Sequence, residues 1–284
     1  MIDPTDPSRI RTAAVRVEGE ALIELGVADV GALLATPDWQ RAAALDGPRH
    51  PAAGVRLAPV VPRPSKVVCV GLNYRTHIQE MGRDLPAYPT LFCKFADCLV
   101  GATDDVVRPP ETAEFDWEVE LAVVVGTPDA RSVRRADDEQ AAAAIAGFTV
   151  LNDVTCRDWQ FRTREWLQGK NWDSTTPVGP WLVTQDEVGG VRPALKVTCS
   201  VNGELMQSDT TGDLLFDPVD LVRYVSTMVR LNPGDIIATG TPGGVGHARK
   251  PPVYLTGGEL LVTEIEGIGR LENRVVAESV EGVS

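Results

Sequence analysis

The apolar residues of this chain fall mostly in short runs that are bounded by turn-forming residues. Runs of this length that are rich in valine and isoleucine predict β-strands. The predicted strands cover residues Lys66–Gly71, Pro89–Phe95, Val119–Gly126, Gly147–Leu151, Lys196–Val201 and Ile236–Gly240. A hairpin turn is predicted at Asn202-Gly203, and a helix at Asp217-Pro218, where aspartate can cap a first turn that contains proline. The pattern therefore predicts more strand than helix.

One predicted strand, within Phe115–Gly126, carries three carboxylates among its apolar residues. Successive side chains of a strand alternate between its faces, so Asp116, Glu118 and Glu120 share one face. The same face continues into Ala122, which favours burial over a solvated strand face. Buried like charges cost several kcal/mol unless a cation compensates them. We therefore expect a metal site on this face.

A further acid follows the next apolar run, where Gly147–Leu151 leads into Asn152 and Asp153. Asp153, Arg157 and Gln160 are spaced four and three apart, which would place them on one side of a helical turn. Asp153 alone would be interpreted as a helix cap. Together with the acids of the preceding strand, it is a candidate for the third ligand of a three-carboxylate site.

Three histidines, His50, His77 and His247, are the first candidates for a general base. His77 and Glu80 are three residues apart after a predicted strand, so a helix would let the carboxylate orient the imidazole. An ordinary surface pair is the alternative. The polar loop Gly82–Pro89 that follows could close over a site.

Two loops carry further candidates. Lys170 follows a glycine shortly after the acid site, where it is either solvated or in contact with an enolate or another part of a substrate. The glycine-rich loop after Thr239 lacks the spacings of phosphate-binding and dinucleotide-binding motifs. Close approach of its backbone to a small ligand is the better interpretation, with Thr241 as a donor.

The composition of the chain limits its possible binding partners and its possible location in the cell. The 284 residues carry a net charge of −13, which disfavours nucleic acid and anionic membranes as partners. Five cysteines without a CxxC pair disfavour a disulfide framework and a structural zinc site. No apolar run approaches the roughly 20 residues of a membrane span, and residues 1–11 lack an apolar secretory core. These observations predict a cytoplasmic protein.

The chain is expected to divide near the proline-rich segment Pro62-Arg63-Pro64. Residues 1–63 contain short apolar segments and an alanine-rich passage, typical of a small N-terminal domain with a linker. Residues 64–284 contain all the candidate chemistry and form the predicted catalytic domain.

Taken in order, the motifs resemble the fumarylacetoacetate hydrolase superfamily. They are HxxE after a glycine-ended strand, the DxExE row, a D-x-x-x-R-D-x-Q turn, GK followed by a DxxxP loop, and ATGTPxGVG, over about residues 64–275. The resemblance implies an α+β, mainly β fold with a mixed β-roll catalytic domain, usually in a homodimer. It also implies a 2-oxo or 2,4-dioxo carboxylate substrate.

The resemblance also assigns roles to residues. The metal ligands would be Glu118, Glu120 and Asp153, with Asp116 as a supporting acid; this all-oxygen set favours Mg²⁺ or Mn²⁺, with Ca²⁺ as a third candidate, over zinc. The substrate would be held by Arg157, Gln160 and Thr241. The catalytic residues would be His77, Glu80 and Lys170.

The predicted reaction is hydrolysis of a carbon–carbon bond in an acylpyruvate such as fumarylpyruvate, in the catabolism of aromatic or related compounds. His77 and Glu80 would activate water, and Lys170 would stabilise the departing enolate. Decarboxylation of oxaloacetate, or isomerisation and decarboxylation of ring-fission diacids, is the alternative within the family. A catalytically silent ligand-binding protein is an alternative of another class, and a glycosidase that uses Glu118 and Glu120 as its carboxylate pair is a third.

Overall fold

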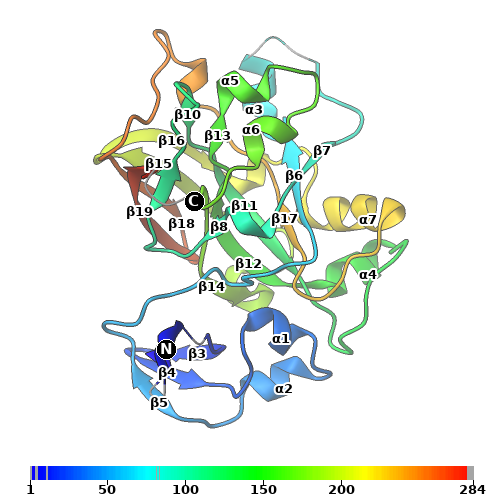
Figure 1. Cartoon of the computed structure of the whole chain (residues 1–284). Helices are drawn as coiled ribbons and strands as arrows, with labels where there is room; N and C mark the ends of the chain where they lie inside the picture. The colour runs from blue at the N-terminus through cyan, green and yellow to red at the C-terminus, as the bar shows by residue number, and fades with distance from the viewer. Residues whose placement is uncertain (1, 4–5, 11, 81, 83, 280–284) are drawn as a thin grey trace.

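Two mixed β-sheets form the main body of the protein in the computed structural model, which describes residues 2–3, 6–10, 12–80, 82 and 84–279 (Figure 1). The seven-stranded sheet has the order β7 (Thr90–Lys94), β6 (Val67–Gly71), β17 (Ile236–Ala238), β11 (Val119–Val125), β12 (Ile145–Asn152), β14 (Thr176–Thr184), β8 (Leu99–Val100). The five-stranded sheet has the order β16 (Glu204–Thr210), β15 (Lys196–Val201), β18 (Leu260–Ile265), β19 (Gly269–Ala277), β9 (Val106–Arg108). Antiparallel pairs predominate, and the α+β, mainly β prediction is confirmed.

Short helices surround these sheets. The end of the molecule at the top of Figure 1 carries α3 (Arg75–Glu80), α5 (Arg157–Gln160) and α6 (Leu167–Lys170). One side carries α4 (Asp138–Ala143) and α7 (Pro218–Met228), and a two-stranded pair joins β10 (Phe115–Asp116) to β13 (Thr155–Cys156). Within the described residues, 3₁₀ turns occur at η1 (Ala96–Cys98), η2 (Gln185–Val188), η3 (Thr211–Asp213) and η4 (Gly246–Ala248). Of the described helices the longest, α7, has 11 residues, and none could span a bilayer.

The central strand β11 is buried along its whole length. One face presents Val119, Leu121 and Val123 to a core shared with the five-stranded sheet. The other face presents Ala122 and Val124 to a second core. Since both faces are covered, the strand is a nearly continuous apolar run, as the sequence pattern indicated.

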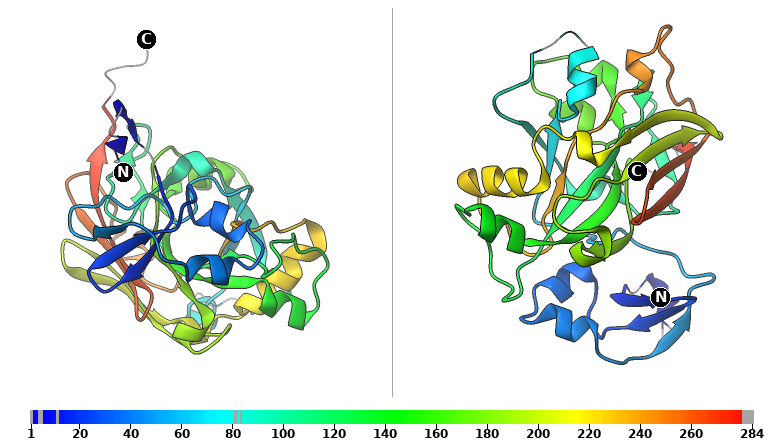
Figure 2. Two further views of the ribbon diagram at one scale, coloured as in Figure 1. Left: turned by 90° about the horizontal axis from the view of Figure 1, so that it is seen from below. Right: turned by 180° about the vertical axis from the view of Figure 1, so that it is seen from behind.

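The second core includes residues of the N-terminal segment, which lies below the main body in Figure 1 and can be followed in the views of Figure 2. This segment contains β1 (Ile2–Asp3), β2 (Asp6–Ile10), β3 (Val15–Glu18), β4 (Ala21–Glu24), α1 (Val30–Leu34), α2 (Trp39–Ala43) and β5 (Arg49–Pro51). Leu34 and Trp39 belong to the same apolar cluster as Val124 and Ala146. The division at residue 63 remains a prediction, and the two predicted parts share this core.

Candidate active site

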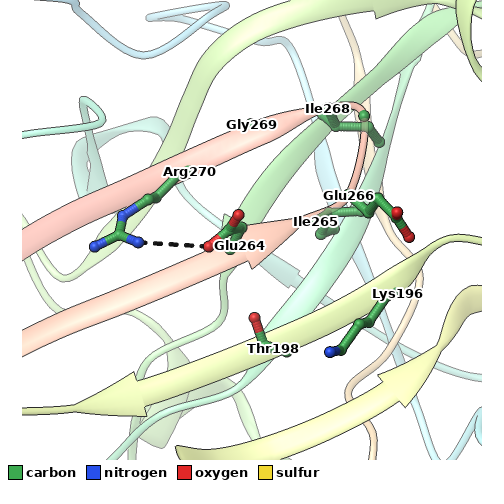
Figure 3. A pocket seen from close by; sticks show the side chains of 9 residues that line it. Lys196, Thr198, Glu264, Ile265, Glu266, Ile268, Gly269 and Arg270 are labelled. Carbon is green, nitrogen blue, oxygen red and sulfur yellow. Dashed lines mark ion pairs between the residues drawn. The ribbon is translucent and has the colours of Figure 1, made fainter. Parts of the chain in front are cut away.

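A surface hollow with a volume of about 580 Å³ lies beside the turn between β18 and β19 (Figure 3). Its polar lining includes Lys196, Glu264, Glu266 and Arg270, and Arg270 is 3.5 Å from Glu264. None of the predicted site residues lines it. The candidate active site therefore rests on a buried cluster elsewhere in the molecule.

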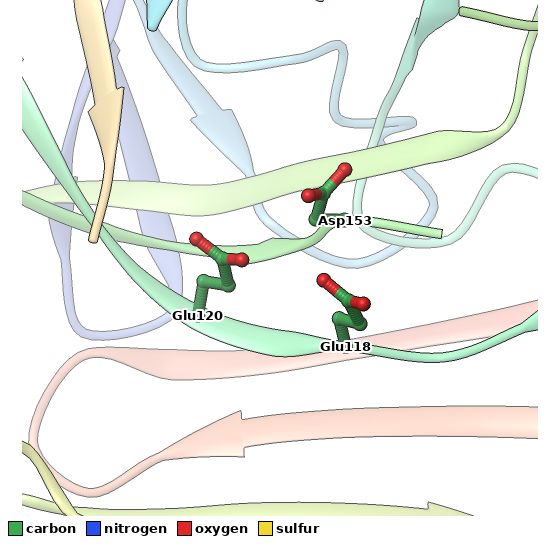
Figure 4. Close-up of side chains that lie close together, drawn as sticks. All are labelled: Glu118, Glu120 and Asp153. Atoms are coloured by element: carbon green, nitrogen blue, oxygen red, sulfur yellow. The ribbon is translucent and has the colours of Figure 1, made fainter. Parts of the chain in front are cut away.

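That cluster is formed by the three predicted metal ligands (Figure 4). Glu118, Glu120 and Asp153 are buried, and each offers a carboxylate oxygen within 4.8 Å of the others. Strand pairing explains the arrangement, because Val119 of β11 lies opposite Asn152 of β12. The residue after β12 therefore lies beside Glu118, and the Asp153 amide donates to the Glu118 carbonyl at 2.8 Å.

The spacing and electrostatics of the three acids fit a divalent cation. Oxygens bound to one hard cation at about 2.0–2.6 Å lie within about 5 Å of each other. Among the described residues the Glu120 carboxylate makes no ion pair, and it accepts a hydrogen bond from the Gly240 amide at 2.7 Å. Burial, together with Asp153 and Glu118, raises the pKa of Glu120 well above its usual range. A bound cation would offset this cost.

Two buried lysines contact the other two acids. Lys170 Nζ is 2.9 Å from Glu118 Oε2 and 2.7 Å from Asp153 Oδ2, and Lys94 Nζ is 3.0 Å from Asp153 Oδ1. Burial alone would favour the neutral amine, but Asp153 and Glu118 raise the pKa of Lys170. Lys170 is therefore a protonated donor beside the acids, as an enolate-stabilising group must be.

Lys94 is a residue that the sequence interpretation did not assign to the site. Its ammonium also donates to the carbonyl oxygens of Val154 at 3.1 Å and Lys170 at 2.6 Å. It thus connects β7 to the residue after Asp153 and to the end of α6. The signal that could have identified it is its place as the only charge in an otherwise apolar predicted strand.

Arg157 is held by three side chains. Its Nε is 2.8 Å from Asp116 Oδ2, its Nη1 is 2.6 Å from Glu118 Oε1, and Nη1 donates to Gln160 Oε1 at 3.0 Å. Asp116 therefore supports Arg157 and lies outside the three-acid cluster. Nη2 of Arg157 is buried without a partner among the described residues, which suits a donor for a substrate oxygen.

The electrostatic result differs between the two glutamates. Burial disfavours the charged form of Glu118, but Lys170 and Arg157 together lower its pKa to about 2. Glu118 is thus a fixed anion, whereas for Glu120 the attraction of Lys170 and the Gly240 hydrogen bond do not offset burial and the two neighbouring acids, and its pKa stays raised.

The helical turn predicted to hold Asp153, Arg157 and Gln160 is only partly present. α5 begins at Arg157, its N-cap is Cys156, and Asp153 lies in the link between β12 and β13. The prediction of one helix face is therefore wrong for Asp153, because β13 pairs with β10 before the chain turns into α5.

A close approach between α5 and α6 aims Lys170 at the acids. A Cβ on Gly169 would lie 2.5 Å from the backbone nitrogen of Gln160 and 2.6 Å from the carbonyl oxygen of Cys156. Only glycine fits between these atoms, and Lys170 is the next residue. The GK dipeptide of the sequence therefore has a geometric reason.

The glycine-rich loop reaches the same cluster from β17. Gly240 has φ +101°, and a Cβ there would lie 2.9 Å from Asn73 Cβ, so the position requires glycine. Its amide contacts Glu120, and Thr241 follows at the edge of the cluster. Gln207, which the sequence interpretation missed, donates to Thr241 Oγ1 at 2.8 Å.

The helix predicted after β6 is present as α3, and it carries a half-buried His77. It lies at the same end of the molecule as α5 and α6 (Figures 1 and 2). The side chain of Glu80, and residues 81 and 83 of the predicted closing loop, lie outside the described part of the structure. The His77–Glu80 pair and the loop closure stay predictions.

Comparison with known proteins bears on this arrangement. A family model described as fumarylacetoacetate (FAA) hydrolase C-terminal matches residues 66–276. The mitochondrial oxaloacetate tautomerase FAHD2A of Homo sapiens is 47% identical over 239 residues, which cover 84% of this chain and 74% of that protein. The rat mitochondrial oxaloacetate tautomerase Fahd2a is 46% identical over 238 residues, with the same two coverages.

Two solved structures extend the comparison. The fumarylacetoacetate hydrolase from Exiguobacterium antarcticum has a TM-score of 0.82 and 35% identity, covering 94% of this chain and 95% of that one. The fumarylpyruvate hydrolase from Pseudomonas aeruginosa, in complex with Mn²⁺ and pyruvate, has a TM-score of 0.66 and 34% identity, covering 75% of this chain and 90% of that one.

The prediction of a cytoplasmic location is contradicted by these relatives, because the similar proteins from rat, cattle and human are named as mitochondrial. The prediction was wrong because it rested on the absence of a secretory signal. The lack of an apolar secretory core argues only against secretion, since organelle-targeting segments are amphipathic and not continuously apolar.

Proposed function

Because the chain belongs to the fumarylacetoacetate hydrolase family, we propose that it is an oxaloacetate tautomerase that uses a divalent metal ion. The enzyme would interconvert the keto and enol forms of this 2-oxo diacid. The observation that carries the proposal is the 46–47% identity to oxaloacetate tautomerases over 84% of the chain. It favours the oxaloacetate alternative over the acylpyruvate hydrolysis that the motifs first suggested.

The metal would be held by Glu118, Glu120 and Asp153, whose spacing suits Mg²⁺ or Mn²⁺. Bound there, the ion would supply Lewis-acid polarisation of the substrate oxygens. The solved neighbour that contains Mn²⁺ together with pyruvate, itself a 2-oxo acid, supports this assignment.

The remaining roles follow from the contacts of the side chains. The unpartnered Nη2 of Arg157 would donate to a substrate carboxylate, and the protonated Lys170 would stabilise the enolate oxygen as its charge develops. Tautomerisation also requires a base that removes a proton from the carbon next to the ketone and an acid, for which we propose Lys170, that protonates the enolate oxygen. His77 on α3 is the proposed base, and no attacking water is needed.

Three rates measured on one preparation test the proposal. The enol form of oxaloacetate is followed by its ultraviolet absorbance, decarboxylation by pyruvate formation, and hydrolysis by loss of fumarylpyruvate. We expect accelerated tautomerisation with Mg²⁺ or Mn²⁺, its loss with EDTA, and its recovery on adding the metal back. Tautomerisation at the uncatalysed rate under all metal conditions would overturn the proposal.

Acylpyruvate hydrolysis is the second candidate, favoured by the 34% identity to a fumarylpyruvate hydrolase. Hydrolysis of fumarylpyruvate without tautomerase activity in the same assay would select it. We also propose a homodimer, which sedimentation velocity of the purified chain would test.

A further inference from the structure

Gln207 joins the strand of the acids to the loop that carries Thr241. The side chain lies on β16 and is only 1% exposed. The Val119 amide donates to its Oε1 at 3.0 Å, and its Nε2 donates to Thr241 Oγ1 at 2.8 Å and to the Pro242 carbonyl at 3.0 Å. The amide therefore bridges the start of β11, where Glu118 precedes the strand and Glu120 lies on it, and the loop after β17.

The orientation of this amide is dictated by its backbone partners. The Val119 amide can only donate and the Pro242 carbonyl can only accept. A flipped Gln207 would therefore place its NH₂ group against the Val119 N–H and its oxygen against the Pro242 carbonyl, and neither pair could form a hydrogen bond. Leaving such buried groups unpaired costs about 1–3 kcal/mol each. The second hydrogen of Nε2 is thus committed to Thr241 Oγ1.

The hydrogen bond from Gln207 to Thr241 Oγ1 determines where the Thr241 hydroxyl can direct its own proton. A hydroxyl has one proton to donate, and here its oxygen already accepts a bond from Gln207. Among the described residues, none receives the Thr241 proton. The side chain is half-buried, and the residue before it, Gly240, donates to Glu120 at 2.7 Å. The proton is therefore available at the edge of the acid cluster.

We propose that Gln207 is a positioning residue that commits Thr241 to donate a hydrogen bond to a carboxylate oxygen of the bound 2-oxo acid. The inference rests on the proposed function for the class of substrate, since a carboxylate oxygen only accepts hydrogen bonds. Gln207 itself does not touch the substrate. It acts through the direction of one hydroxyl proton.

Substitution of Gln207 by glutamate reverses the bond without changing the shape of the side chain. A carboxylate can still accept from the Val119 amide, but it cannot donate to Thr241 Oγ1 and would instead accept the threonine proton. We expect Gln207→Glu to weaken Mg²⁺-dependent pyruvate binding by about 10- to 100-fold, the effect of one hydrogen bond to a charged group. Calorimetry measures the dissociation constant for pyruvate, and the affinity for Mg²⁺ alone should change little.

Thr241→Val removes the hydroxyl at nearly constant volume and should weaken pyruvate binding by a similar factor. In the Thr241→Val background, Gln207→Glu should have no further effect, because the bond it reverses is already absent. If Gln207→Glu acted only through the charge of the new carboxylate, it would also weaken pyruvate binding in the Thr241→Val background. The double variant would then lose affinity by the product of the two single-variant factors. Gln40→Glu, an exposed position on α2, is the matched control for added charge.

The two proposals fail in distinguishable ways. Absence of oxaloacetate turnover in the wild type would overturn the proposed function, while pyruvate binding still measures the role of Gln207. Pyruvate affinity within twofold of wild type in Thr241→Val, or multiplicative factors in the double variant, would overturn the positioning role. If Gln207→Glu does not fold, the comparison of Thr241→Val with Thr241→Ser decides, since only serine keeps the donor.

Discussion

Glu118, just before β11, and Glu120, on β11, are two residues apart but have different electrostatic surroundings. Glu118 forms ion pairs with Lys170 and Arg157, whereas the Glu120 carboxylate accepts a hydrogen bond from the Gly240 amide and forms no ion pair with a described residue. The pKa of the first is lowered to about 2 and that of the second is raised well above its usual range. Removing the charge at these two positions should therefore change the free energy of unfolding in opposite directions.

Glu118→Gln should lower the free energy of unfolding by about 3–5 kcal/mol at pH 7, because it leaves buried cations without their partner. The contribution of Glu118 is present above its usual pKa of 4.5 and is lost as the pH falls toward about 2. Glu120→Gln should raise the free energy of unfolding, because ionising Glu120 costs stability above pH 4.5. Urea unfolding in EDTA measures the free energy of unfolding of both variants. Equal destabilisation of the two would contradict the different electrostatic roles assigned to Glu118 and Glu120.

Metal binding should stabilise the fold and report on the three acids without an assay of activity. An ion present at 100 times its dissociation constant adds about 2.7 kcal/mol to the stability of the state that binds it. We expect Mg²⁺ to raise the melting temperature of the wild type and to leave that of Glu120→Gln unchanged. Glu266→Gln, at an exposed position, is the control and should respond as the wild type does.

The spacing of residues close in sequence identified part of this site. It could not identify residues that reach the site from distant segments. Glu118 and Glu120 could be identified from neighbouring residues alone, but the single predicted strand is wrong, because the chain breaks between Asp116, the end of β10, and Val119, the start of β11. Lys94 contacts a carbonyl 60 positions away, and Gln207 contacts an amide 88 positions away. Such contacts depend on the pairing of distant strands, which periodicity does not encode.

Single elements were predicted best where a turn residue or a cap fixes them. The Asn202-Gly203 turn joins β15 to β16 with φ values of 50° and 83°, and Asp217 caps α7 through the amides of Val219 and Asp220. The α5 turn was predicted too early, because tertiary pairing of β13 delays the start of the helix.

The contact between α5 and α6 provides a test of how elements aim a catalytic side chain. Gly169→Ala places a methyl group 2.5 Å from the Gln160 backbone, so the helices must separate and Lys170 must move away from the acids. We expect activity to fall by at least about tenfold, as a displacement of about 1 Å can cost about 100-fold. Circular dichroism should show a folded chain. Gln168→Ala, the exposed neighbouring position, should keep the wild-type rate and is the matched control.

For the molecule as a whole, the shared core predicts that the N-terminal segment and the sheets unfold together. Leu34 is fully buried in the cluster that includes Val124 and Ala146. Leu34→Ala should cost about 2–5 kcal/mol and should shift a single unfolding transition. Leu45→Ala, at a residue that is 61% exposed, should change the stability little. Two separate calorimetric transitions would show instead that the predicted domains are energetically independent.

The assembly of the site from distant segments also has a kinetic consequence. The Gly240 amide meets Glu120 across 120 positions of sequence, and Lys170 meets Glu118 across 52. Such long-range contacts must close large loops, so the acids should gather only after the rate-limiting step of folding. Mg²⁺ should then leave the refolding rate constant unchanged and slow unfolding, because it stabilises the native state but not the transition state. Stopped-flow refolding and unfolding with and without Mg²⁺ measure both rate constants, and faster refolding would mean that the acids are already together at the barrier.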